Sequence, residues 1–161
     1  MNFTLRKAKK EDALDLLHLI QELATFEKEP DAVALTVEDL QRDGFGNNPL
    51  FSCYVAEIDS EIVGMALFYF RYSTWKGKTV HLEDLIVKSE HRGKGIGKAL
   101  YEKVLQFAAA ENVKRVEWVV LNWNKNAIDF YKKSGAQVLK DWYLVQMDDN
   151  RIRNFGRSQK S

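Results

Sequence analysis

The chain has 161 residues, 45% of them hydrophobic and 29% charged, which is ordinary for one globular domain. Its 24 lysines and arginines nearly balance 23 acidic residues, and this argues against a non-specific nucleic-acid binder. The single cysteine, Cys53, cannot form an internal disulfide, and the sequence has no signal-peptide pattern and no apolar run long enough to span a membrane. We therefore expect one soluble, cytoplasmic domain over residues 1–148 and a polar tail over 149–161.

The first half of the chain reads as strands and helices in turn. "FTLRKA" (3–8) alternates as a strand does, and helical spacing of apolar residues predicts a helix from Ala13 to Ala24. Thr36 and Asp39 have the spacing of a capping box, which predicts a second helix over 36–46. Three predicted strands follow, over 50–58, 61–72 and 79–87, with a hairpin turn at Asp59-Ser60 between the first two.

The second half begins with a glycine-rich segment, after which an apolar stripe predicts a helix from Ile96 to Ala108. The remaining predicted elements are a strand over 114–121, a short helix over 124–135 and a final strand over 136–147. The last residues are polar and show no period, so we expect a frayed tail there. Hairpins followed by crossover helices predict an α/β (α+β) fold, in which helices flank a mixed sheet.

The glycine-rich segment "HRGKGIGKAL" (91–100) joins a predicted strand to a predicted helix. It does not fit an NTPase phosphate loop, because Ala99 stands where serine or threonine would hold magnesium. It does not fit a dinucleotide fingerprint either, because Lys98 replaces the last glycine. Free backbone N–H groups at a helix start attract anions, and glycines let a pyrophosphate approach closely. The segment therefore predicts a site that binds a diphosphate without cleaving it.

The segment "LEDLIVKSEHRGKGIGKAL" (82–100) resembles the acetyl-CoA loop of the GNAT superfamily of N-acetyltransferases. Residues 22–51, 72–87 and 122–136 resemble the diamine acetyltransferases, which include the spermidine/spermine enzymes, and are closest to their thialysine-type branch. The resemblance covers about residues 4–145 and implies the GNAT acyl-CoA N-acyltransferase fold. It also implies transfer of the acetyl group of acetyl-CoA to a primary amine, by direct attack of the neutral amine on the thioester. The implied acceptor is a small aliphatic amine: a thialysine-like amino acid, a diamine or a polyamine.

The same resemblance implies which residues hold acetyl-CoA, and it suggests no metal site. The strand residues Leu85, Ile86 and Val87 would pair with the pantetheine arm. The pyrophosphate would lie on the loop residues Arg92, Gly93, Lys94, Gly95, Ile96, Gly97 and Lys98. The other wall of the cofactor cleft would consist of Asn124, Lys125, Asn126 and Tyr131.

Two residues carry the implied chemistry. The resemblance assigns Glu83 to the substrate amine as its cation partner and base, acting directly or through water. It assigns Tyr131 to the leaving thiolate as a general acid. Asp84 either lines the amine site or is satisfied structurally, and strand alternation predicts that it points away from Glu83. His81 shares the face of Glu83, where a packing role is favoured over a catalytic one.

The acceptor site is implied at Phe26, Glu27 and Trp75, together with Glu83 and Asp84. Phe26 replaces a tyrosine common in spermine-acting members, and Ser73 stands where those members carry an acidic residue. Both departures favour a small primary amine over a long polyamine. The family also implies a homodimer.

Two other functions remain open at this point. One is a protein or peptide N-acetyltransferase of the same fold, and the other is a non-catalytic, CoA-binding regulatory module. The presence of both Glu83 and Tyr131 argues against the second.

Overall fold

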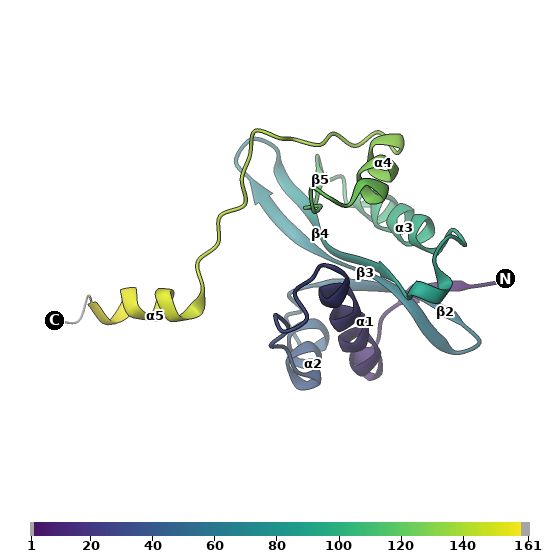
Figure 1. Ribbon diagram of the computed structural model, residues 1–161, viewed down its shortest axis with the longest axis horizontal. Helices are drawn as coiled ribbons and strands as arrows, with labels where there is room; N and C mark the ends of the chain where they lie inside the picture. Colours follow the sequence, from purple (N-terminus) through teal and green to yellow (C-terminus); the bar gives the residue numbers. More distant parts are fainter. Residues whose placement is uncertain (1, 159–161) are drawn as a thin grey trace. The chain divides into compact units, whose positions relative to one another are not determined.

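The computed structural model describes residues 2–158, which form two compact units, one ending at Val119 and the other beginning at Val120. The elements of the first unit are β1 (Thr4–Lys7), η1 (Lys10–Asp12), α1 (Ala13–Phe26), α2 (Val37–Phe45), β2 (Ser52–Ile58), β3 (Glu61–Ser73), β4 (Gly77–Val87), η2 (Ser89–His91), α3 (Ile96–Ala110) and β5 (Val116–Glu117). Figure 1 labels the α-helices and the strands β2 to β5. The second unit holds α4 (Lys125–Lys133) and α5 (Asp149–Ser158). None of the helices within residues 2–158 has the length and apolar character needed to cross a membrane.

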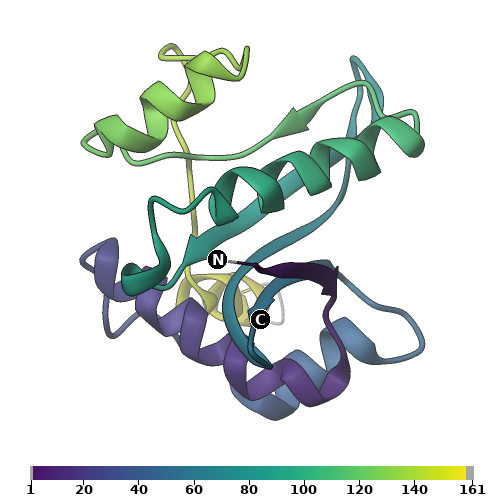
Figure 2. The same cartoon turned by 90° about the vertical axis from the view of Figure 1, so that its right-hand side faces the viewer.

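The five strands of the first unit form one mixed sheet in the order β1-β2-β3-β4-β5. The pairs from β1 to β4 are antiparallel, and β4 pairs with β5 in parallel. Figure 2 shows α3 on one side of the strands and α1 with α2 on the other. This arrangement confirms the predicted mixed sheet with helices on its faces.

The two faces of the sheet bury different side chains of the same strand. On one face, Phe68 of β3 contacts Phe107 of α3, with ring centroids 4.9 Å apart. On the other face, the neighbouring Leu67 belongs to a buried cluster that includes Leu16 and Leu19 of α1. Alternation along β3 therefore sends successive side chains to α3 and to α1.

The capping box predicted at the start of α2 is confirmed. The Thr36 hydroxyl accepts a hydrogen bond from the Asp39 amide (3.1 Å), and the Asp39 carboxylate accepts one from the Thr36 amide (3.0 Å). These two bonds satisfy backbone donors that the helix itself leaves free, so the helix begins at Val37.

Two of the predicted strands are wrong in extent. The strand predicted over 114–121 is limited to Val116 and Glu117. The final strand predicted over 136–147 does not form, and no strand in the described part of the chain pairs with this segment. Its apolar side chains are exposed, including Tyr143 at 91% and Val145 at 88%. A β-favourable composition makes a strand only where a neighbouring edge accepts its hydrogen bonds.

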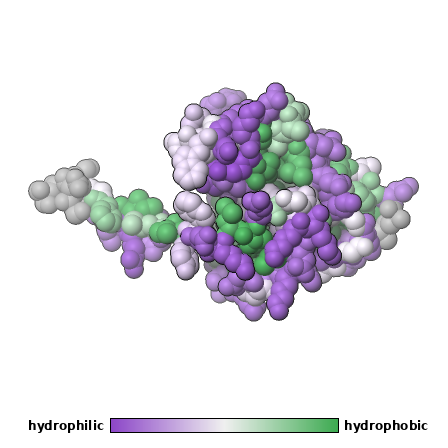
Figure 3. Space-filling model, turned by 90° about the horizontal axis from the view of Figure 1, so that it is seen from above, coloured by the Kyte–Doolittle hydropathy of each residue, from purple (hydrophilic) through white to green (hydrophobic). Residues whose placement is uncertain are grey.

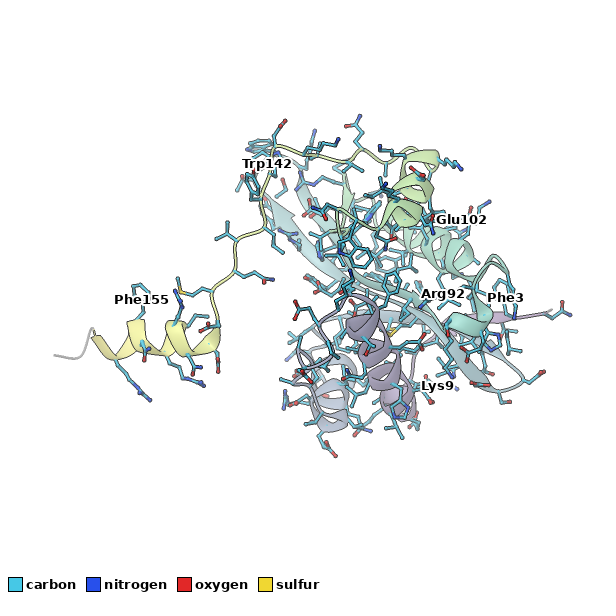
Figure 4. All side chains as sticks on the ribbon, in the orientation of Figure 1. Phe3, Lys9, Arg92, Glu102, Trp142 and Phe155 are labelled. Carbon is cyan, nitrogen blue, oxygen red and sulfur yellow. The ribbon has the colours of Figure 1, made fainter. Side chains whose placement is uncertain are left out.

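The prediction of a frayed tail is wrong for Asp149–Ser158, which form α5, while residues 159–161 lie outside the described part. The helix is supported by local polar contacts. The Arg151 amide donates to the Asp148 carboxylate at 2.9 Å, and Arg153 forms an ion pair with Asp149 at 2.6 Å, four residues earlier. Its apolar side chains, such as Phe155 (labelled in Figure 4), are exposed, and Figure 3 shows green hydrophobic atoms on the surface of this segment.

Candidate active site

The glycine loop, residues 92–98, connects β4 and η2 to the start of α3. Gly93 and Gly95 have φ values of +75° and +83°, in the left-handed region that favours glycine. Gly95 is the N-cap of α3, and the first hydrogen bond of the helix runs from the Ala99 amide to its carbonyl (3.0 Å). The amides of Ile96, Gly97 and Lys98 precede that bond, at the helix positions whose amides have no acceptor within the helix itself. That they bind an anion stays a prediction.

The Arg92 side chain contacts both the strand before the loop and the helix α1. Its Nε donates to the Val87 carbonyl at 2.8 Å, and its guanidinium lies 3.5 Å from the Glu22 carboxylate. The same guanidinium lies 5.2 Å from the ring centroid of Phe26 on α1 (Arg92 is labelled in Figure 4). Arg92 therefore links the loop to β4 and α1, and the Phe26 ring packs against its guanidinium.

The edge of β4 that faces β5 is paired with that strand along only part of its length. Within residues 2–158, β5 pairs with β4 only at Val80–Val116 and His81–Glu117. The next six positions, through Val87, have no strand on that edge. Leu85, Ile86 and Val87 therefore lie on an edge that an extended ligand could pair with.

The register of β3 and β4 contains a β-bulge at Glu83. Phe68 is opposite Leu82, but the preceding Leu67 is opposite Asp84, so Glu83 is an extra residue in β4. Because Asp84 is opposite Leu67, it lies on the face of the sheet that α1 covers. The bulge therefore shifts the alternation of side chains along β4 by one residue.

Glu83 faces the same side as Asp84. Its Oε2 accepts a hydrogen bond from the Tyr69 hydroxyl at 2.7 Å and lies 3.3 Å from Nε2 of His81. Tyr69 and His81 are paired across the strands, and Tyr69 lies two residues along from Leu67, so this is the α1 face. The prediction that Glu83 and Asp84 occupy opposite faces is wrong, because the bulge interrupts strict alternation.

Glu27, Glu83 and Asp84 form an acid cluster on this face. Glu27 follows the last residue of α1, and burial raises the pKa of its carboxyl. Burial, followed by the negative charges of Glu83 and Glu27, raises the pKa of Asp84 to about 6. Among residues 2–158, no lysine, arginine or histidine forms an ion pair with Asp84 or Glu27. The cluster therefore concentrates negative charge where an amine cation would be stabilised.

The sequence analysis missed a polar network that reaches Glu83 through His81. Nδ1 of His81 is 3.0 Å from the guanidinium of Arg71, which in turn is 2.9 Å from the Glu117 carboxylate. Burial and the hydrogen bond to Glu83 raise the pKa of Tyr69 to about 12, so its hydroxyl stays a donor. These residues come together through the strand register, which the sequence does not show. The sequence indicated only that His81 and Glu83 lie on the same face of their strand.

Trp75 is not part of this cluster. It lies in the turn between β3 and β4 and is 77% exposed. Glu83 lies six positions after Gly77, which is about 20 Å along an extended strand. The hydroxyl of Ser73 accepts hydrogen bonds from the amides of Trp75 and Lys76, both at 3.2 Å, and so stabilises the turn.

The other predicted residues belong to the second unit. Asn124 is the N-cap of α4, where its side chain accepts a hydrogen bond from the Ala127 amide at 3.2 Å. Lys125 and Asn126 follow in the exposed first turn. Tyr131 is half-buried on the same helix, and its ring centroid lies 5.3 Å from that of Phe130.

Comparison with known proteins relates this arrangement to acyl-transfer enzymes. A family model described as "Acetyltransferase (GNAT) family" matches residues 13–136. The thialysine N-epsilon-acetyltransferase of Bos taurus is 42% identical over 160 residues, covering 92% of this chain and 94% of the relative. The Caenorhabditis elegans protein of the same name is 36% identical over 157 residues, covering 96% of this chain and 97% of the relative.

A solved structure has the same fold. An integron cassette protein from the mobile metagenome of V. cholerae superposes with a TM-score of 0.79 at 23% sequence identity, covering 98% of this chain and 99% of that one.

Proposed function

Because the chain belongs to the GNAT family of acetyltransferases, we propose that it transfers the acetyl group of acetyl-CoA to a small aliphatic amine. The acceptor we propose is a thialysine-like amino acid or a short diamine. The acid cluster carries this proposal, because it places Glu83 and Asp84 on the strand that leads into the glycine loop. Among residues 2–158, neither Asp84 nor the third member, Glu27, forms an ion pair with a protein cation. The relatives from Bos taurus and Caenorhabditis elegans, both named thialysine N-epsilon-acetyltransferases, support the choice of acceptor.

The glycine loop fits the diphosphate of acetyl-CoA. Within residues 2–158, a Cβ built on Gly93 or Gly95 would meet no heavy atom within 4 Å apart from those of its chain neighbours, so the space beside both glycines is open. The amides at the start of α3 would donate to the phosphates, and the free edge of β4 would pair with the pantetheine arm. Acetyl-CoA, when bound, supplies the acetyl group as a thioester.

The acid cluster would bind the acceptor and remove its proton. An alkylamine has a pKa of about 10.4, so it arrives as a cation and must lose a proton before it can act as a nucleophile. Asp84 and Glu27 would hold the charged amine, and Glu83 would accept its proton directly or through water. The Tyr131 hydroxyl would donate a proton to the departing sulfur.

The proposed preference for short amines rests on charge. The cluster offers three carboxylates, and Ser73 adds none. A long polyamine carries more positive charges than this site would compensate. Thialysine, lysine and short diamines should therefore be better acceptors than spermine.

A thiol-release assay tests the proposal. The purified chain is given acetyl-CoA and one acceptor at a time: thialysine, lysine, short diamines, spermidine, spermine or a lysine-containing peptide. We expect the highest kcat/KM for thialysine or a short diamine. A preference for spermine would reject the proposed acceptor class, and activity on the peptide alone would support a protein acetyltransferase. Absence of turnover with every acceptor, despite acetyl-CoA binding, would support a regulatory module.

A further inference from the structure

His81 of β4 connects the acid cluster to Arg71 of β3 and Glu117 of β5. Its Nε2 lies 3.3 Å from Oε2 of Glu83, and its Nδ1 lies 3.0 Å from the guanidinium of Arg71 on β3. Arg71 is fixed in turn by the Glu117 carboxylate of β5, 2.9 Å away. Side chains from three strands thus form one continuous row that ends at Glu83.

The chemistry of these partners determines which ring nitrogen carries the hydrogen. A guanidinium can only donate, so Nδ1 of His81 must accept from Arg71. Burial lowers the pKa of His81, Arg71 acts in the same direction, and Glu83 and Glu117 oppose both. The ring is therefore neutral at neutral pH, with its hydrogen on Nε2, the nitrogen that faces Glu83.

From this geometry we infer that His81 is a positioning residue for the acetyl-transfer reaction. The Tyr69 hydroxyl donates to Oε2 of Glu83, and Nε2 of His81 lies 3.3 Å from the same oxygen, so Oε1 is the oxygen left to face the amine. This inference rests on the proposed role of Glu83 as the proton acceptor.

Glu83 needs such support because of its place in the fold. It is the extra residue of a bulge, and its side chain is 49% exposed. Without partners on Oε2, the carboxylate would rotate freely among its rotamers. The Tyr69 hydroxyl and the His81 nitrogen at one oxygen fix the position of the other in advance, and small errors in placement cost activity steeply.

If His81 only packed against its neighbours, its ring nitrogens would not matter for activity. The His81 ring lies against Tyr69, with centroids 5.3 Å apart, and a phenyl ring would fill the same space.

Three variants separate the packing role from the positioning role. His81→Phe keeps the ring and loses both nitrogens, His81→Gln keeps a nitrogen donor near the position of Nε2, and His81→Asn carries the same amide but is too short to reach Glu83.

Kinetics of the full chain with acetyl-CoA and its best acceptor provide the first readout. We expect His81→Phe and His81→Asn to lower kcat about 10- to 100-fold, with KM for acetyl-CoA unchanged. His81→Gln should recover kcat to within a few-fold of the parent. His18→Phe is the matched control, because His18 lies on α1 nine residues before Glu27, and it should leave both constants unchanged.

The second readout does not depend on activity. Nitrogen-15 spectra of the imidazole rings at neutral pH should show the Nε2–H tautomer for His81. The signal is assigned by its loss in His81→Gln, since the chain has only three histidines. A predominant Nδ1–H tautomer would overturn the inference.

The kinetic outcomes separate this inference from the proposed function. Parent-like kcat in His81→Phe, or equal loss in His81→Gln and His81→Asn, would overturn the role of His81 provided that Glu83→Gln is impaired. Parent-like turnover of Glu83→Gln would instead reject Glu83 as the proton acceptor, whatever the His81 variants show.

Discussion

The glycine loop and two members of the acid cluster, Glu83 and Asp84, belong to consecutive stretches of one chain segment, yet the two sites are built from different atoms. The loop offers backbone amides, and its geometry depends on the left-handed φ of Gly93 and Gly95. The acid cluster offers side-chain carboxylates: burial raises the pKa values of Glu27 and Asp84, and the charges of Glu83 and Glu27 raise that of Asp84 further. Backbone amides do not titrate near neutral pH, whereas the charge of the carboxylates depends on pH. The two regions should therefore respond to different perturbations.

The largest expected effect is on turnover, in Glu83→Gln. Loss of a positioned proton acceptor should lower kcat about 10²- to 10⁴-fold while acetyl-CoA affinity stays the same. Steady-state kinetics and calorimetry measure the two quantities. Glu38→Gln, an exposed carboxylate on α2, is the control. An equal loss of acetyl-CoA affinity would mean that the cluster and the loop do not act separately.

Tyr131→Phe tests a group outside both regions. If the hydroxyl protonates the departing sulfur, kcat should fall by about 10²- to 10⁴-fold with little change in binding. The phenyl ring would still pack against Phe130. A kcat within a few-fold of the parent would remove Tyr131 from the proposed mechanism.

Gly95→Glu tests the loop. The variant places a negative charge where the diphosphate is expected, and calorimetry should show acetyl-CoA affinity reduced about tenfold beyond the loss in Gly95→Ala. The alanine variant is the matched control, since both residues carry the cost of about 1–2 kcal/mol for a left-handed φ. Equal affinities in the two variants would contradict a diphosphate site at this position.

Asp84→Asn tests the electrostatics of the cluster through stability. The folded-state pKa of about 6 lies above the ordinary value of 3.8, so ionisation costs the folded protein stability as pH rises through this window. Asparagine does not ionise, and the variant should gain about 1–2 kcal/mol on the parent at pH 8, allowing for partial solvent screening. The gain should vanish below about pH 4. Denaturant unfolding at both pH values measures it, and a pH-independent difference would contradict the pKa shift.

Ser73→Ala should give the smallest effect. The variant loses two hydrogen bonds in the exposed turn between β3 and β4, at a cost of about 0.5–1 kcal/mol in the free energy of unfolding. Ser73→Asp retains an acceptor for both amides and serves as the control for the turn. If that variant improves kcat/KM for spermine, then charge at this position selects the acceptor, as the sequence comparison suggested.

Several features followed from short stretches of sequence. The capping box of Thr36 and Asp39 lies within four residues, and the structure has it as predicted. The turn at Asp59-Ser60 joins β2 and β3, and both residues adopt positive φ. The predicted homodimer and cytoplasmic location stay predictions, because neither depends on contacts within one chain.

The sequence by itself determined the capping box, the hairpin turn and the glycine loop, because each is decided by the conformational preferences of neighbouring residues. Only the tertiary structure decided the bulge at Glu83, which no glycine or proline marks in "LEDL", and with it the common face of the acid cluster. It also decided that residues 136–147 form no strand despite their composition. Strand register and pairing depend on what a distant segment offers as a partner, and that information is not local in the chain.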